Sequence, residues 1–134
     1  KVAGNPAFTD QQTVTLELNC RNAAEYRVVE GSNFTGVLFQ PMAATIPFSL
    51  SAGDGSKQIS VQYRASTGNV VTAVLPNGIL FDTQGPALAI TNPAEGSYIT
   101  NAITVSATAS DPAGVTRVEF YGDEKLAATD TRGA

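Results

Sequence analysis

The chain has 134 residues, of which 43% are hydrophobic and 15% are charged. Its eight basic and twelve acidic residues give a net charge of −4, and neither sign is gathered into a block that could neutralise a nucleic-acid backbone. No apolar run reaches the roughly 18 residues of a membrane helix, and the apolar content argues against disorder. The composition therefore excludes nucleic acid as a partner and membrane insertion. The chain begins at Lys1 without Met, which indicates a piece of a longer protein.

Alternating apolar residues predict strands throughout the first half of the chain. The clearest strand covers residues 13–20, because Val14, Leu16, Leu18 and Cys20 fall on one face of it. A second clear strand covers residues 57–64, with Ile59, Val61 and Tyr63 on one face. Shorter strands are predicted at 26–30, 37–39, 46–50, 70–75 and 79–81. No segment has a helical period, so the sequence predicts an all-β protein.

Two residues in these strands indicate where in a sheet they lie. Pro47 lacks a backbone donor, so its strand is expected at the edge of a sheet. Cys20 is the only cysteine and cannot form an internal disulfide. Its place in the alternating series predicts a small apolar filler on an inward strand face. The chain has no histidine that could act as its base, so Cys20 is not expected to be a catalytic nucleophile.

A boundary is predicted at Gly85-Pro86, since Gly and Pro together end a strand and stiffen a short link. Residues 1–85 are expected to form one complete domain, and residues 86–134 the N-terminal half of a second. The second part offers strands at 103–109 and 115–121 and a hairpin through 122–124. Residues 13–18 can also be laid on residues 102–107, a spacing of about 90 residues that is typical of tandem repeats.

These segments carry a family resemblance. The run Ser51-Ala52-Gly53-Asp54-Gly55-Ser56-Lys57, together with residues 61–69 and 81–86, resembles the immunoglobulin-like repeats of bacterial and archaeal surface proteins. Residues 90–96, 105–111 and 115–121 resemble another bacterial Ig-like repeat, found beside secreted enzymes and adhesins. The resemblance implies an Ig-like β-sandwich followed by the first strands of a second one. It also implies an extracellular or cell-surface location in bacteria, with neighbouring Ig-like domains of the same polypeptide as partners.

The sequence departs from the antibody-type pattern, which pairs cysteines around a tryptophan. Tryptophan is absent, so the core must be held by aliphatic side chains together with Tyr26, Phe48, Tyr63 and Phe81.

No group of residues predicts an enzyme. A Ser-His-Asp system is impossible without histidine, and no motif suggests a positioned Ser-Lys pair. Asp123 and Glu124 are adjacent at a hairpin tip, where they cannot flank a glycosidase cleft. The family has no shared catalytic residues to carry over. The sequence therefore predicts neither catalytic residues nor a cofactor, calcium excepted.

Three aspartates are the acidic positions of interest. Asp54 and Asp111 precede Gly and Pro and are interpreted as turn residues, because an Asp side chain can bond the backbone one or two residues on. Asp82 lies beside the predicted link and is the candidate calcium ligand, since a hard cation takes six to eight oxygen ligands. No Asp-x-Asp-x-Asp spacing reinforces that site, and a turn role for Asp82 stays open.

Two functions remain open. The first is a non-catalytic spacer or stalk module that holds another domain away from the bacterial envelope. The alternative is an adhesion or carbohydrate-recognition module, or an accessory of a secreted hydrolase, that uses loops at one end of the sandwich. Phe34, Phe39 and Tyr98 lie near turns and are the candidate stacking platforms for sugar, with core or edge packing as the alternative.

The partial second domain is predicted to have an apolar face that its own residues cannot cover. About 48 residues follow Pro86, too few to bury a sufficient core alone. The predicted apolar face consists of Val105, Ala107, Ala109, Val118 and Phe120. Either the first domain or a second copy of the chain must cover it. We expect self-association through a second copy, because the Gly85-Pro86 link is short and stiff.

Overall fold

The computed structural model of the protein describes residues 1–131, and all regular elements among them are strands. The all-β class predicted from the sequence is therefore confirmed. The chain divides into two compact units, Lys1–Thr83 and Gln84–Ala134. That residues 1–85 and 86–134 are separate domains stays a prediction. Residues 1–131 include no helix long and apolar enough to cross a membrane.

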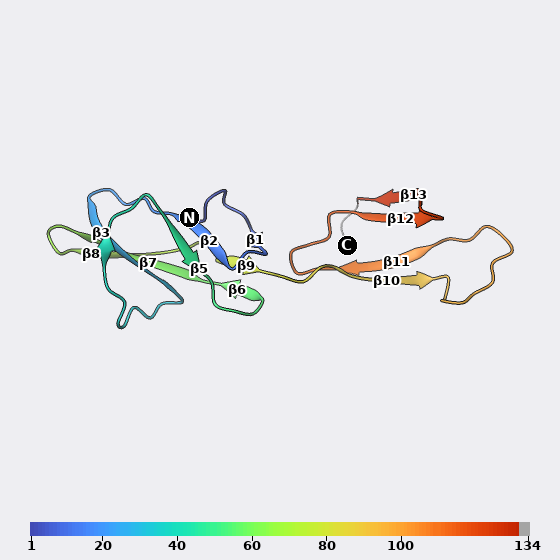
Figure 1. Ribbon diagram of the computed structural model, residues 1–134, viewed down its shortest axis with the longest axis horizontal. Coiled ribbons are helices and arrows are strands. Elements are labelled where there is room, and N and C mark those ends of the chain that lie inside the picture. The colour runs from blue at the N-terminus through green and yellow to red at the C-terminus, as the bar shows by residue number, and fades with distance from the viewer. Residues whose placement is uncertain (132–134) are drawn as a thin grey trace. The chain divides into compact units, whose positions relative to one another are not determined.

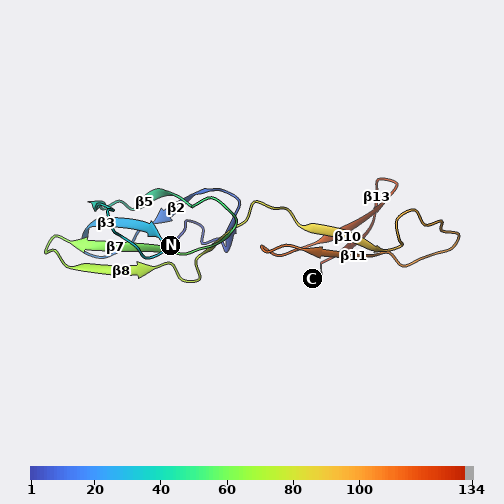
Figure 2. The same cartoon turned by 90° about the horizontal axis from the view of Figure 1, so that it is seen from below.

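The first unit is an Ig-like β-sandwich (Figures 1 and 2). Strand β2 pairs with β5, both antiparallel, and a four-stranded sheet has the order β4-β3-β7-β8. A third small sheet has the order β1-β9-β6. The strands are β1 (Phe8–Thr9), β2 (Thr13–Glu17), β3 (Ala23–Glu30), β4 (Gln40–Pro41), β5 (Thr45–Ser49), β6 (Gly55–Lys57), β7 (Ile59–Ala65), β8 (Val70–Val74) and β9 (Ile79–Phe81).

The core of the first unit follows the predicted alternation. Residues Val14 and Leu16 of β2 are buried, and Leu18 is buried just beyond its end, while Thr13 and Thr15 are exposed. From β7, the same core receives Ile59, Val61 and Tyr63; from β9, it receives Ile79 and Phe81. Half-buried Cys20 packs against this core, as expected of an apolar filler. The predicted inward faces are confirmed.

Strand β5 lies at a sheet edge, which confirms the prediction from Pro47. It pairs only with β2, and Pro47 stands opposite Thr15 in the register. Pro47 is exposed, and because proline has no N–H, no buried acceptor depends on a hydrogen bond from it.

The strand predicted at 37–39 is wrong. Residues 31–39 form a loop, and the next strand is the short β4. The N–H of Val37 bonds to the carbonyl of Phe34 (3.1 Å), and the guanidinium of Arg27 donates to the carbonyls of Phe34 (3.4 Å) and Val37 (2.9 Å). Because the turn and the Arg27 side chain satisfy these backbone groups, the loop needs no strand partner.

The strand predicted at 57–64 is confirmed over residues 59–64 as part of β7, but the chain changes sheets at Gln58, so Lys57 belongs to another strand. Strand β6 pairs with β9, whereas β7 pairs with β3 and β8. The carbonyl of Gln58 accepts from the N–H of Gly31 (2.7 Å), and its side-chain Nε2 donates to the carbonyl of Leu75 (2.6 Å). At Gln58, where the chain passes from one sheet to the other, these two bonds take the place of hydrogen bonds to a neighbouring strand.

The second unit consists of two antiparallel hairpins. Strand β10 (Ala87–Asn92) pairs with β11 (Ser106–Ser110), and β12 (Val118–Gly122) pairs with β13 (Lys125–Asp130). The strands predicted at 103–109 and 115–121 each begin three residues later in the structure. The hairpin turn predicted at 122–124 is confirmed, since Asp123 and Glu124 both adopt positive φ between paired Gly122 and Lys125.

The second unit has no buried side chain between residues 84 and 131. Many of its large apolar residues are exposed, including Leu88 (63%) and Ile90 (64%) of β10, while Val118 and Phe120 of β12 are half-buried. Apolar residues from all four strands line a cavity of about 260 Å³ within the second unit. It is lined in part by Leu88, Ile90, Ala107, Val118, Phe120 and Ala127, and we call this lining the open apolar face.

Candidate functional site

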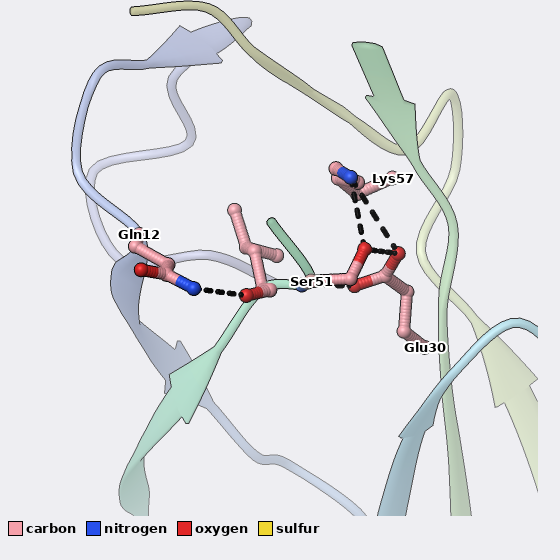
Figure 3. Close-up of polar contacts among 5 residues, drawn as sticks. Gln12, Glu30, Ser51 and Lys57 are labelled. Carbon is pink, nitrogen blue, oxygen red and sulfur yellow. Dashed lines mark hydrogen bonds and ion pairs between the residues drawn. The ribbon is translucent and has the colours of Figure 1, made fainter. Parts of the chain in front are cut away.

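A cluster of Glu30, Ser51 and Lys57 joins a buried lysine to a carboxylate and a hydroxyl in the first unit (Figure 3). Lys57 is 8% exposed, and its Nζ donates to Ser51 Oγ (2.9 Å) and lies 3.9 Å from Glu30 Oε1. Both the N–H and the hydroxyl of Ser51 donate to the Glu30 carboxylate (2.8 and 2.6 Å). The ammonium also lies 5.9 Å from the centre of the Phe81 ring. We call these three residues the polar cluster.

Three separate elements bring the polar cluster together. Glu30 ends β3, Ser51 follows β5, and Lys57 ends β6. The backbone just before Ser51 is held by Gln12. The N–H of buried Leu50 donates to the carbonyl of Gln12 (2.8 Å), and the carbonyl of Leu50 accepts from Gln12 Nε2 (3.1 Å). Figure 3 shows Gln12 on the opposite side of this segment from Lys57.

Burial raises the pKa of Glu30, but other contacts outweigh it. The hydrogen bonds from the side chain and backbone of Ser51 lower the pKa, as does the positive charge of Lys57, so the pKa lies below its ordinary value of 4.5. The carboxylate is therefore charged at neutral pH and holds both of its partners.

This pKa shift predicts an acid-sensitive contribution to stability. A carboxyl group whose pKa is lowered on folding stabilises the protein above its ordinary pKa, and this contribution is lost as the pH falls through the folded value. We expect the free energy of unfolding of the native chain to exceed that of Glu30→Gln most clearly above about pH 5. The difference should shrink below pH 4.5. Denaturant melts of both proteins from pH 6 to pH 3 measure it; a difference that grows on acidification contradicts the prediction.

The polar cluster brings together a serine and a lysine that no motif predicted as a pair. Ser51 and Lys57 flank the turn through Gly53 and Gly55, and only the return of that turn places Nζ beside Oγ. A Ser-Lys nucleophile needs a lysine free to accept the hydroxyl proton. Here Lys57 donates to the hydroxyl oxygen, and the hydroxyl proton bonds to Glu30. The arrangement joins the ends of β3 and β6 to the segment after β5, and Lys57 acts in it as a donor to the hydroxyl oxygen.

A second set of polar contacts covers the other face of the four-stranded sheet. Arg27 Nε donates to Gln62 Oε1 (2.8 Å), and Arg64 Nε donates to Glu25 Oε2 (2.6 Å). The Phe39 ring lies against both guanidinium groups, 4.5 Å from Arg27 and 4.1 Å from Arg64. These contacts fix the loop of residues 31–39 on the sheet.

The candidate sugar platforms therefore differ in accessibility. Phe34 is buried at 9% exposure and lies 5.2 Å from the Arg27 guanidinium, and Phe39 is half-buried against the two arginines. Core and edge packing explains both rings. Tyr98 is fully exposed, on the long connection between β10 and β11. Of the three aromatic residues, Tyr98 alone presents an open ring.

The aspartates have distinct roles. Asp111 is a turn residue as predicted, since its Oδ1 accepts from the N–H of Ala113 (2.8 Å). Asp54 bonds over a long range instead: its Oδ1 accepts from the N–H (3.1 Å) and the hydroxyl (2.9 Å) of Thr83. The local turn role predicted for the Asp54 side chain is thus wrong. Asp82 is 6% exposed, and its N–H donates to the carbonyl of Thr9 (3.0 Å).

The calcium role of Asp82 stays a prediction. The described residues contain no group of three or more His, Cys, Asp or Glu side chains placed to hold a metal ion. Calcium at Asp82 would therefore need most of its six to eight oxygens from backbone carbonyls and water. Titration calorimetry with millimolar calcium, on the native chain and on Asp82→Asn, measures this directly. A calcium site predicts heat and a raised melting temperature in the native chain alone; the absence of both contradicts it.

Comparison with known families adds to the geometry of the second unit. Residues 86–134 match the family model described as a bacterial Ig domain. No curated protein and no solved structure matches the chain. Bacterial Ig domains are in general non-catalytic modules that occur in surface or extracellular proteins. The match confirms the resemblance found in residues 90–121, and the first unit has the Ig-like fold expected from its own motifs. Residues 86–134 are thus similar to the bacterial Ig domains, and they follow an Ig-like β-sandwich in this chain.

Proposed function

We propose that this chain is a non-catalytic spacer or stalk module of a bacterial cell-surface or secreted protein. The bacterial Ig match supports the cellular setting. The observation that carries the proposal is the polar cluster, in which the side chains most able to perform chemistry are bonded to one another. The hydrogen bonds and the ion pair among Glu30, Ser51 and Lys57 join three segments of the first unit, which suits a structural role.

A screen with hydrolase substrates tests the absence of catalysis. We expect no turnover from the native chain above that of Ser51→Ala, which lacks the only hydroxyl of the polar cluster. Thr13→Ala is the matched control, because it removes a hydroxyl from an exposed strand position. Turnover that Ser51→Ala abolishes and Thr13→Ala retains would overturn the proposal.

A recognition module is the second candidate, and one observation favours it. Tyr98 is 101% exposed, and Ile99, beside it, is 48% exposed. An open aromatic ring on a connecting loop suits stacking against a sugar. Binding of the native chain to a panel of polysaccharides, compared with Tyr98→Ala, separates the two candidates. Saturable binding that Tyr98→Ala loses would favour recognition, and no binding by either protein would favour the spacer.

The open apolar face supports a further part of the proposal, that a second copy of the chain covers the second unit. A pair of two-stranded ribbons with no buried side chain is marginal by itself, because each ribbon needs a partner for its apolar face. Leu88→Lys introduces a charge at a residue that is 63% exposed, so it should disturb the contact between copies more than the fold.

Sedimentation of the native chain and of Leu88→Lys measures this association. We expect the native chain to associate as its concentration rises and Leu88→Lys to associate at least tenfold more weakly, roughly 1.4 kcal/mol in binding free energy. Lys125→Ala, at an exposed strand position outside the face, serves as the control. Equal association by all three proteins would place the contact elsewhere, and a monomer at every concentration would exclude it.

A further inference from the structure

The outer edge of β8 is an unprotected strand edge in the first unit. Strand β8 ends the order β4-β3-β7-β8, and within residues 1–131 it pairs with β7 alone. Its register with β7 runs without a bulge, and residues 65–81 contain no charged side chain. Proteins commonly protect such edges with a lysine, a proline within the strand or a bulge. Strand β8 has none of these.

The hydrogen bonds of β8 show which backbone groups point outward. The N–H of Leu75 donates to the carbonyl of Ile59 (2.8 Å), and the N–H of Ala65 donates to the carbonyl of Asn69 (2.9 Å). Bonding alternates along an antiparallel strand, so the odd-numbered residues of β8 bond inward to β7. The N–H and C=O groups of Val70, Thr72 and Val74 therefore point toward the free edge.

The sequence of β8 is complementary to itself about Thr72. If two copies of β8 lie antiparallel with Thr72 opposite Thr72, then Val70 stands opposite Val74 and Val71 opposite Ala73 of the other copy. Every residue pair then joins small or β-branched side chains, and the central pair joins two threonines. Such pairs stabilise antiparallel sheets, and an uncharged edge brings no like-charge repulsion.

We propose that the first unit binds a second copy of itself by antiparallel pairing of β8 with β8, centred on Thr72. The pairing satisfies the outward groups of all three even-numbered residues in both copies. It also covers Val70, Val71 and Val74, which are 46%, 55% and 53% exposed. A two-fold pairing uses the same edge in both copies and leaves no free β8 edge, so it ends at a dimer through this surface.

The second copy is favoured over a different protein by the match of the two edges. Both strands have the same five-residue length, and both lack charge, so neither leaves an unpaired ionic group at the contact. The proposal is independent of the spacer function and of the open apolar face, since β8 belongs to the first unit.

Three substitutions at Thr72 test the pairing in the full chain. Thr72→Pro removes the outward N–H and leaves the inward bonds to β7 in place. Thr72→Lys places two like charges directly opposite each other at the centre of the contact. Thr72→Val keeps the N–H and is the matched control, because it loses the hydroxyl that accepts from Gln62 Nε2 (3.1 Å), as Thr72→Pro does.

Amide hydrogen exchange at increasing protein concentration provides the site-specific measurement. We expect the amides of Val70, Thr72 and Val74 to gain protection with concentration in the native chain and in Thr72→Val. The inward amides of Val71 and Ala73 should be protected at every concentration. Thr72→Lys should remove the concentration-dependent protection at the remaining outward amides while its melting temperature stays close to that of the native chain.

Sedimentation of the same variants completes the test. Made in the Leu88→Lys background, which removes the contact through the open apolar face, Thr72→Pro and Thr72→Lys should each weaken the remaining association at least tenfold, and Leu88→Lys alone should leave the β8 protection unchanged. Outward amides that exchange freely in the native chain at millimolar concentration would overturn the proposal. So would association of Leu88→Lys that survives both Thr72 substitutions. If Thr72→Pro fails to fold, Thr72→Lys and Thr72→Val still decide the result.

Discussion

Leu16→Ala is expected to lower the free energy of unfolding of the first unit by about 3 kcal/mol, within the range for Leu→Ala changes in tightly packed cores. Leu16 of β2 is 2% exposed and belongs to the core that β5, β7 and β9 also line. The truncation loses the transfer free energy of the removed atoms and leaves a cavity, because strands on both sides restrict collapse. Denaturant melts followed by tyrosine fluorescence measure the change.

Glu17→Gln is the matched control for this prediction. Glu17 is the next residue of β2 and lies on the opposite face, where it pairs with the exposed Lys1 side chain (3.0 Å). An exposed ion pair contributes little, so the change should cost under about 0.5 kcal/mol. A larger loss from Glu17→Gln than from Leu16→Ala would contradict the assigned faces of β2. Gln62, although it faces away from the core, is unsuitable as a control because it bonds Arg27 and Thr72.

Glu30→Ala is expected to cost about 2 kcal/mol, less than the loss of a partner from a fully buried ion pair. It leaves the ammonium of Lys57, which is 8% exposed, without its counter-charge, and it leaves the N–H and hydroxyl of Ser51 without their acceptor. The cost is reduced because the side chain of Glu30 itself is 27% exposed. Lys57→Met should cost less, about 1 kcal/mol, because its apolar stem is retained and Glu30 can be hydrated.

A double-mutant cycle with Glu30→Ala and Lys57→Met isolates the coupling between the two residues. We expect the double variant to be more stable than the sum of the single changes implies, because Glu30→Ala costs little once the buried ammonium is gone. The exposed Lys1–Glu17 pair provides a comparison: its atoms are closer, 3.0 Å against 3.9 Å, yet its coupling should be smaller. Equal coupling free energies in the two pairs would show that burial does not determine how much an ion pair contributes to the stability of the fold.

The sequence predicted strands best where one face is buried and the other is exposed. The alternation of Val14, Leu16 and Leu18 determines the inward face of β2, because a shift of one residue would expose all three. Predictions failed where side chains replaced the ladder. Residues 37–39 of the loop resemble a strand in composition. The Arg27 guanidinium, however, donates to the carbonyls of Phe34 and Val37, so these groups need no neighbouring strand. The proposed repeat has the same weakness, since of residues 102–106, which align with β2, only Ser106 belongs to a strand.

The sequence by itself determined the all-β class, the inward faces of β2 and β7, the edge position of Pro47 and the resemblance of residues 86–134 to bacterial Ig domains. These follow from local patterns, because period-two alternation and turn residues act within a few positions of one another. Only the tertiary structure decided where the chain changes sheets at Gln58, which rings Arg27 and Arg64 cover, and that Glu30, Ser51 and Lys57 meet. Each of these depends on contacts between residues 6 to 39 positions apart, and no local pattern specifies which loops will return to the same place.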